Sequence, residues 1–191
     1  MNSKILKSQI LLLKLYAGYR ELDHALASYR PLYQSLNTNP VLHAERGRKH
    51  AQYELAQLYR RIEYLQHCHF VELVIEGEKR LLKLTSKGKY EILRMRFVEH
   101  MMVQKKKAWD RKWRIAFFDI PESKKKYRNF FRRLLKQNEF KMIQRSVWMT
   151  PYNPQPHLDE LLKYLGLEKH FEIMEAECEK CSKGFLKKFK L

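Results

Sequence analysis

Cysteine is scarce in this sequence, long hydrophobic runs are missing, and acidic residues are outnumbered. The three cysteines are an odd number without secretory context, which predicts a reducing cytoplasm and no disulfide framework. The apolar run 10–13 is short and is flanked by Lys7 and Lys14, so it fits neither a signal peptide nor a membrane span. We therefore expect a cytoplasmic protein without a membrane partner.

The shortage of acidic residues leaves 39 Lys and Arg against 21 Asp and Glu, a formal net charge of +18. Residues 101–150 carry 15 basic and 4 acidic side chains, so they supply 11 of these 18 charges. A field of this sign attracts polyanions and weakens as salt is added. Since 45% of the residues are hydrophobic, a packed core is also expected. Composition favours a folded nucleic-acid-binding protein; the alternative is a ribosome-associated or merely basic soluble protein.

The first hundred residues combine helical patterns with one hairpin. Apolar residues at 55, 58, 62 and 65 step by three and four, which is typical of one buried helix face. Two β-like runs, 70–75 and 80–85, flank a turn that contains Gly77, and residues 89–100 have a helical pattern. Together with shorter helices before residue 40, this order predicts a winged helix-turn-helix that binds the major groove. The alternative is an α+β domain whose helix only packs on a sheet.

From Trp113 the pattern changes to alternating strands and helices. Strands are expected at 113–118, 140–144, 147–150 and 171–177, with amphipathic helices around 127–134 and 158–165. The order β-α-β-β-α-β is the ferredoxin-like plan. The sequence thus predicts an α+β protein with a winged helix-turn-helix in residues 1–100, a linker in 101–112 and a ferredoxin-like domain in 113–191.

The second half also carries a family resemblance. Its central run reads WRIAFFDIPESKKKYRNFFRRLLKQNEFKMIQRSVWMTP. This run resembles the central domain of the PaaX-family repressors of phenylacetate degradation, which is itself similar to the small CRISPR adaptation endonuclease. The matching features are the strand ending in FDIPE, the basic helix with Arg132 and Arg133, and the QRSVW segment before Pro151. A winged helix before such a domain is the PaaX order.

The resemblance implies a transcriptional regulator that binds double-stranded DNA at the nucleoid as a homodimer, with the ferredoxin-like domain as the dimerisation unit. PaaX repressors carry a further domain after this one, whereas this sequence stops at Leu191. We therefore expect the short form, and no small-molecule effector is carried over. Residues 181–191 are expected to add a strand to the partner subunit.

The candidate DNA contacts lie before, on and after the helix that precedes the hairpin. Arginine and lysine can bind guanine edges and glutamine can bind adenine, whereas phosphate contacts only position the protein. The alternative for each residue is solvated surface. The phosphate candidates are Arg46, Arg48 and Lys49, the helix candidates are Gln52, Gln57, Tyr59, Arg60 and Arg61, and the candidates at the hairpin tip are Lys79 and Arg80.

A second basic surface is expected in the later half of the chain. Its residues share one amphipathic helix and its approach, and they are Lys124, Lys125, Arg128, Arg132 and Arg133. One interpretation is a second DNA-binding surface that follows a longer duplex. The other is a solvated face whose charges pair with acidic groups across a dimer. The sequence does not rank them.

Asp119 is the one weak catalytic and metal candidate. It ends the first strand of the second domain, and in the adaptation endonuclease the matching aspartate meets its dimer mate around a divalent metal. Two such carboxylates can hold Mg²⁺ and activate water. The alternative is that Asp119 caps the helix that starts near Glu122. We expect no enzyme activity and no cofactor, with an Mg²⁺-dependent nuclease or adaptation factor as the alternative.

Two further motifs are weak metal candidates. Cys178 and Cys181 have the spacing of one ligand pair of a zinc site. Two more ligands are missing unless His170 or residues 67–69 supply them. Glu175, Glu177 and Glu179 alternate along a strand and share one face. An acidic cluster with Asp119 is one interpretation, and a solvated face or pairing with the partner's basic helix is the preferred one. The leading hypothesis is a repressor reading an inverted-repeat operator; the rivals are a nuclease and an architectural DNA binder.

Overall fold

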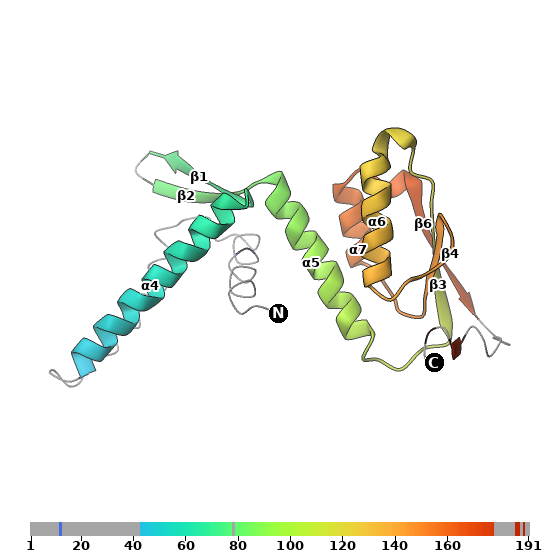
Figure 1. The fold of residues 1–191 in the computed structure, drawn as a ribbon, viewed down its shortest axis with the longest axis horizontal. Helices are drawn as coiled ribbons and strands as arrows, with labels where there is room; N and C mark the ends of the chain where they lie inside the picture. The colour runs from blue at the N-terminus through green and yellow to red at the C-terminus, as the bar shows by residue number, and fades with distance from the viewer. Residues whose placement is uncertain (1–11, 13–42, 78, 178–185, 188, 190–191) are drawn as a thin grey trace. The chain divides into compact units, whose positions relative to one another are not determined.

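The computed structural model describes residue 12, residues 43–77, residues 79–177, and residues 186, 187 and 189. For residues 43–52, 54, 55, 76, 79 and 80 the description covers the backbone alone. The chain forms two compact units, Met1–Ile92 and Leu93–Leu191, whose elements are labelled in Figure 1. None of the helices in the described part of the chain is long and apolar enough to cross a membrane.

The first unit contains a long helix, a hairpin and the beginning of a second helix. Strands β1 and β2 pair antiparallel from Val71 opposite Leu84 to Glu76 opposite Lys79. Gly77 starts the turn with a φ of 63°, which glycine adopts without steric penalty. The predicted helix and hairpin are both present. The elements are α4 (His43–His67), β1 (Val71–Glu76), β2 (Lys79–Leu84) and α5 (Ser86–Gln104).

The core of this unit follows the predicted apolar spacing of α4. Leu58, Ile62 and Leu65 are each at most 5% exposed, and they pack with residues of both strands and with Ile92 of α5. Leu12, which is helical, is buried in the same core. The other helices expected before residue 40 lie outside the described residues, and so does most of the predicted helix-turn-helix.

Helix α4 ends in a tight backbone motif that determines where the hairpin begins. The Phe70 N–H donates to the Leu65 carbonyl and the His69 N–H to the Gln66 carbonyl, while His69 has a φ of 56°. This is the Schellman arrangement, in which glycine is the usual left-handed residue. Phe70 packs on the core that contains Leu65, so the turn is fixed from both sides.

The Thr-Ser-Lys-Gly segment at the start of α5 has a specific packing role. Thr85 precedes the helix and accepts a hydrogen bond from the Gly88 N–H at 3.0 Å, while its own hydroxyl donates to the His69 carbonyl at 2.7 Å. A Cβ on Gly88 would lie 2.0 Å from the Phe70 carbonyl oxygen. Glycine is therefore required here because the first turn of α5 touches the backbone that leaves α4.

The second unit has the predicted β-α-β-β-α-β order. Its sheet has the strand order β4-β5-β3-β6 with antiparallel neighbours, so β5 lies between β4 and β3, as in a split β-α-β plan. Helices α6 and α7 lie against the same face of this sheet (Figure 1). The bounds are β3 (Lys112–Phe118), η1 (Glu122–Lys124), α6 (Lys125–Gln137), β4 (Lys141–Gln144), β5 (Val147–Thr150), α7 (His157–Tyr164), η2 (Glu168–His170) and β6 (Phe171–Glu177).

Aromatic rings join the helix layer to the sheet. Phe118 of β3 stacks on Phe171 of β6 with ring centres 5.5 Å apart, and Phe131 of α6 lies at the same distance from Phe171. Side chains alternate along β3, so Trp113 lies on the opposite face. There Trp113 packs against Phe189 and Met149. The described residues Leu186, Lys187 and Phe189 are helical, so they do not form the strand expected within residues 181–191.

The predicted boundary between the domains needs correction. Helix α5 begins at Ser86 and continues to Gln104, so its end extends into the predicted linker 101–112, and β3 already starts at Lys112. The two units divide between Ile92 and Leu93, inside α5, rather than at residue 100. The periodicity of residues 89–100 identified the helix but contained no signal for either of its ends.

Candidate nucleic-acid interface

The exposed face of α4 combines aromatic and charged side chains. Tyr53 and Tyr64 are 60% and 45% exposed, and Arg60 is also exposed. At 3.6 residues per turn these three lie on the side opposite the buried stripe. Glu63 is exposed on the flank of the same side. The face can therefore stack and hydrogen-bond, but the Glu63 carboxylate opposes a continuous row of phosphates.

The structure separates the residues predicted to contact DNA in this unit. Tyr59 and Arg60 are exposed, whereas Gln57 and Arg61 are partly buried at the edge of the apolar stripe. Four others lie in α4 and two at the start of β2, and their side chains are outside the described residues. These six are Arg46, Arg48, Lys49, Gln52, Lys79 and Arg80.

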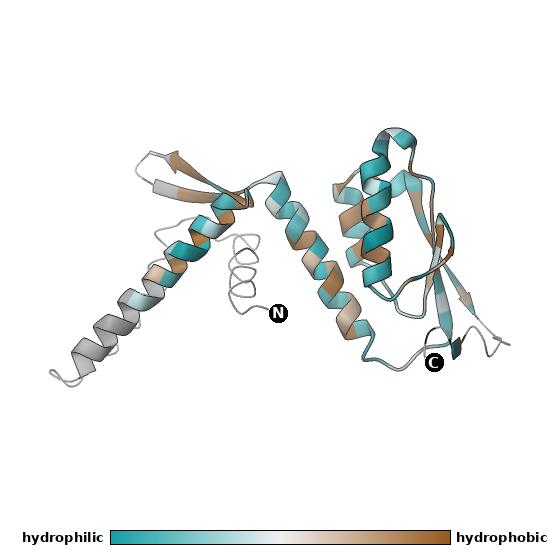
Figure 2. Cartoon of the chain, viewed as in Figure 1, coloured by the Kyte–Doolittle hydropathy of each residue, from teal (hydrophilic) through white to brown (hydrophobic). Residues whose placement is uncertain are grey.

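Helix α6 has an outer face of a different kind. Its sequence, KKYRNFFRRLLKQ, contains six basic and no acidic residues, while Phe131, Leu134 and Leu135 are buried. Figure 2 shows α6 as largely hydrophilic on the side facing the viewer. Two exposed residues of this face, Lys126 and Lys136, were not among the predicted members of the second basic surface. The i, i+7 spacing of Lys126 and Arg133 was the signal that could have found Lys126.

One carboxylate balances part of this charge near the start of α6. Glu122 pairs with Arg128 at 2.5 Å and with Lys125 at 3.3 Å, and these two cations lower the pKa of Glu122, with Arg128 the main cause. Lys124 instead donates to the Gly166 carbonyl at 3.2 Å, so it bridges to the end of α7 and does not extend the open face. No ion pair is found for Lys126, Arg133 or Lys136 within the described ranges.

The turn between β4 and β5 adds another cation to this face. The Arg132 Nε–H donates to the Arg145 carbonyl at 3.2 Å, which holds the turn against α6. The side chain of Arg145 is exposed. The sequence could not assign Arg145 to this surface because the contact joins residues thirteen positions apart.

Asp119 lies at the end of β3 and is exposed, beside a hollow of about 310 Å³ that Ser146 and His170 also line. Its backbone N–H donates to the His170 carbonyl at 2.9 Å. The expectation that Asp119 caps the next helix is wrong, because η1 starts at Glu122 after Pro121 and has no side-chain cap. Within the part of the chain described, no group of three potential metal ligands is found.

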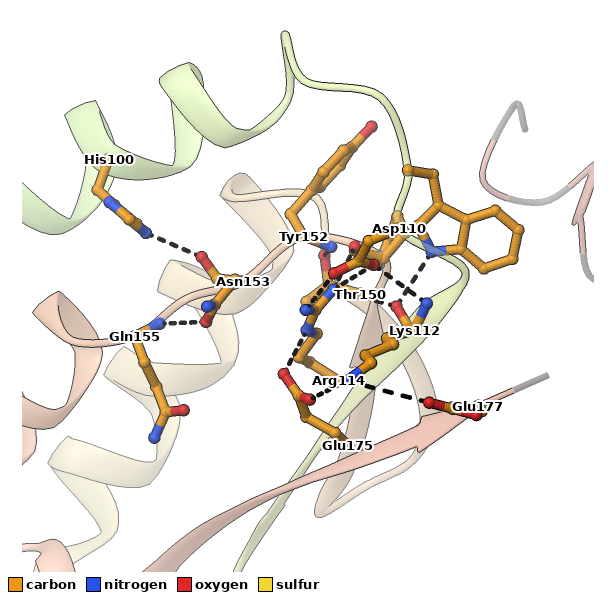
Figure 3. Close-up of polar contacts among 12 residues, drawn as sticks. His100, Asp110, Lys112, Arg114, Thr150, Tyr152, Asn153, Gln155, Glu175 and Glu177 are labelled. Atoms are coloured by element: carbon orange, nitrogen blue, oxygen red, sulfur yellow. Dashed lines mark hydrogen bonds and ion pairs between the residues drawn. The ribbon is translucent and has the colours of Figure 1, made fainter.

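The acidic face of β6 is paired within its own chain. Glu175 accepts from Arg114 Nε at 3.1 Å and lies 3.4 Å from Lys112 Nζ, and Glu177 lies 4.0 Å from the same lysine (Figure 3). Because Arg114 is opposite Glu175 and Phe118 is opposite Phe171, Glu175 lies far along the strand from Asp119. The interpretation as an acidic cluster with Asp119 is therefore wrong. Glu179, Cys178 and Cys181 lie outside the described residues.

Arg114 is the centre of this polar network. Its side chain is 6% exposed and donates to both carboxylate oxygens of Asp110, to Glu175 and to the Pro151 carbonyl. Hydrogen bonding to Arg114 is the main cause that lowers the pKa of Asp110. A buried guanidinium is stable only when its donors are satisfied, and here they are. Arg114 therefore stabilises the start of β3 and is unavailable to a ligand.

A second polar cluster joins α5 to α7 within this unit. His100 Nε2 lies 2.9 Å from the Asn153 carbonyl, and its ring meets that of His157 edge-on at 4.7 Å. Arg96 pairs with Glu160 at 2.8 Å, next to His157. Burial, followed by the charges of His100 and Arg96, lowers the pKa of His157. This cluster is a structural junction and presents no open cation to a nucleic acid.

The β-α-β-β-α-β unit with its basic helix can be compared with known families. Residues 106–185 match the family model described as the PaaX protein central Cas2-like domain. This part of the chain is similar to the Cas2-like domain of PaaX proteins. A comparison with curated proteins gave no match. The resemblance inferred from the FDIPE strand and the basic helix is thus confirmed for the Cas2-like domain, and the PaaX family indicates a transcriptional regulator.

Proposed function

We propose that this protein is a sequence-specific regulator that binds double-stranded DNA as a homodimer and represses transcription from an inverted-repeat operator. The observation that carries the proposal is the long helix α4 directly before the hairpin β1–β2, in a chain whose residues 106–185 match the Cas2-like domain of PaaX proteins. The net charge of +18 favours a polyanion as the partner, and the PaaX family indicates that this polyanion is DNA.

Sequence reading is assigned to α4. The helix directly precedes the hairpin β1–β2, which is the position of the recognition helix in a winged helix-turn-helix. Arg60 can bind a guanine edge, and Tyr53 and Tyr64 supply flat, polar-tipped contact area on the same face. The Glu63 carboxylate on the flank of this face discourages nonspecific phosphate contact, which suits a surface that discriminates between bases.

The homodimer is supported by the sheet face that α6 and α7 leave open. Met174 is 56% exposed there opposite Ile115 of β3, and Phe117 and Val147 form the next register pair on the same face, both partly buried. An open apolar patch next to a covered one is typical of a surface that a second subunit buries. Two-fold symmetry would then produce two half-sites about one or more helical turns apart.

The test is selection from a random duplex pool at about 150 mM salt, where screening weakens nonspecific phosphate binding. We expect an enriched inverted repeat that remains uncut when Mg²⁺ is present. Absence of any enriched motif would contradict the proposal and favour an architectural binder. Cleavage in the Mg²⁺ arm, lost in Asp119→Asn, would favour the nuclease alternative. No cofactor or effector is part of the proposal.

A further inference from the structure

We propose that the outer face of α6, extended by Arg145, binds the phosphate backbone of duplex DNA without sequence preference, in addition to the operator contacts of α4. This inference rests on the proposed function and names a second site for it. We call this surface the α6 face. It consists of Lys125, Lys126, Arg128, Arg132, Arg133, Lys136 and Arg145.

The geometry of the α6 face suits a charged backbone. Lys126 and Arg133 are seven residues apart, as are Lys125 and Arg132, so the face carries two nearly parallel rows. From Lys125 to Lys136 the helix rises about 16 Å. That length exceeds the width of the major groove, about 12 Å, so the rows can reach phosphates on both edges of a groove.

The nearby carboxylates do not neutralise this face. Glu122 pairs with Lys125 and Arg128 only. The acidic residues expected to pair with a partner's basic helix, Glu175 and Glu177, already pair with cations of their own β3. The interpretation that the α6 face pairs with acidic groups across a dimer therefore loses its best acceptor, and an external polyanion becomes the favoured partner.

A membrane surface fits less well than DNA. A helix that binds lipid headgroups inserts its apolar side between the acyl chains. The apolar side of α6 is occupied, because Phe131, Leu134 and Leu135 are at most 2% exposed in the core. Arginine is also as frequent as lysine on this helix, and guanidinium groups bind phosphate oxygens in a bidentate manner.

The experiment measures the salt dependence of duplex binding by the full chain, using fluorescence anisotropy with the selected operator and with a random duplex. The variant is K126Q/R133Q, because both residues are exposed and neither has an ion pair among the described residues. The matched control is R111Q/K187Q, which removes two exposed charges outside α6. Circular dichroism and the thermal midpoint verify that both variants fold.

Each phosphate contact contributes about 0.9 to the slope of log K against log salt. We expect K126Q/R133Q to lower the slope by about 1.8 on both duplexes, with roughly tenfold weaker binding and an unchanged preference for the operator. The control should keep the wild-type slope. An unchanged slope in K126Q/R133Q, or an equal change in the control, would overturn the inference.

Two other outcomes separate this inference from its rivals. If the wild-type chain binds neither duplex, the proposed function fails together with the inference. If it selects an operator and K126Q/R133Q binds it normally, only the inference fails. Sedimentation at the same salt concentrations tests the remaining rival. Weakened self-association of the variant would place the α6 face in a subunit interface and overturn the assignment to DNA.

Discussion

The helices α4 and α6 are alike on their buried sides and differ on their exposed sides. Both bury a three-residue apolar stripe, Leu58, Ile62 and Leu65 in α4 and Phe131, Leu134 and Leu135 in α6. The α4 surface mixes tyrosine, arginine and glutamate, whereas α6 presents only basic charge. Dense charge of one sign provides affinity for a polyanion, whereas a surface of mixed chemistry can discriminate between bases.

The largest expected effect comes from a substitution that destabilises the unit containing α4 and leaves the unit containing α6 intact. Gly88→Ala places a Cβ 2.0 Å from the Phe70 carbonyl oxygen, so the first unit should lose about 3 kcal/mol of unfolding free energy. Urea unfolding measures this loss. Operator preference should disappear while salt-dependent binding to random duplex persists.

The control for Gly88→Ala is Gly77→Ala. Gly77 also has a positive φ, but none of the described residues has an atom within 4 Å of the position that its Cβ would take. Only the backbone cost of about 1 kcal/mol therefore applies. Equal destabilisation by the two substitutions would contradict the close approach of α5 to Phe70.

A smaller effect is expected from a substitution on the exposed face of α4, to which base discrimination is assigned. Arg60→Ala should weaken operator binding by about 2 kcal/mol, roughly thirtyfold, because a side chain that pairs with a base edge is lost. Binding to random duplex should change little. Competition anisotropy with the two duplexes measures the ratio. Arg111→Ala, the matched loss of an exposed arginine in the other unit, should leave the ratio unchanged; an equal drop would refute the assignment.

The third prediction concerns the second unit alone. The lowered pKa of His157, caused mainly by burial, means that the unfolded chain binds this proton more readily than the folded one. Stability is therefore complete above pH 7 and falls as the pH drops below about 6.5. His157 faces His100, Arg96 and Glu160. His100 and Arg96 disfavour a protonated His157, and Glu160 alone of the three favours it.

Thermal midpoints at pH 7.5 and 5.5 test this dependence. His157→Gln should show a smaller decrease on acidification than the wild type. His170→Gln, which removes a histidine outside the cluster, should keep the wild-type decrease. An identical pH response in wild type and His157→Gln would show that this junction does not control the stability of the unit.

The smallest expected effect concerns the backbone motif with which both α4 and α7 end. The left-handed residue after α4 is His69, whereas the equivalent position after α7 is Gly166, with a φ of 61°. His69→Gly should therefore stabilise the first unit by about 1 kcal/mol, measured by urea unfolding. Gly166→Ala should have the opposite sign in the second unit. A destabilised His69→Gly variant would indicate a role for the His69 side chain.

Local periodicity predicted much of the fold. The spacing of Leu58, Ile62 and Leu65 identified the buried side of α4, and the strand 171–177 was predicted with the bounds that the structure shows. Apolar patterns succeed here because each reports one buried face of one element. The amphipathic pattern of α6 likewise predicted its basic outer face.

The site was less predictable because its decisive contacts are long-range. Glu175 was expected to be solvated or paired across a dimer, yet Arg114, 61 positions away in the chain, holds it. Arg145 joins the α6 face through one hydrogen bond, from the Arg132 side chain to the Arg145 carbonyl, that no spacing rule reveals. The helix cap expected of Asp119 failed because Pro121 and η1 intervene before α6.

The central claim is a division between base reading by α4 and backbone binding by α6, and side-chain footprinting with mass spectrometry tests it most directly. Lysine acylation reports Lys126 and Lys136, and hydroxyl-radical oxidation reports Tyr53 and Tyr64. With the selected operator, all four should be protected; with a random duplex, the two lysines should remain protected and the tyrosines reactive. Lysines that stay reactive on both duplexes, or tyrosines equally protected on both, would contradict the account.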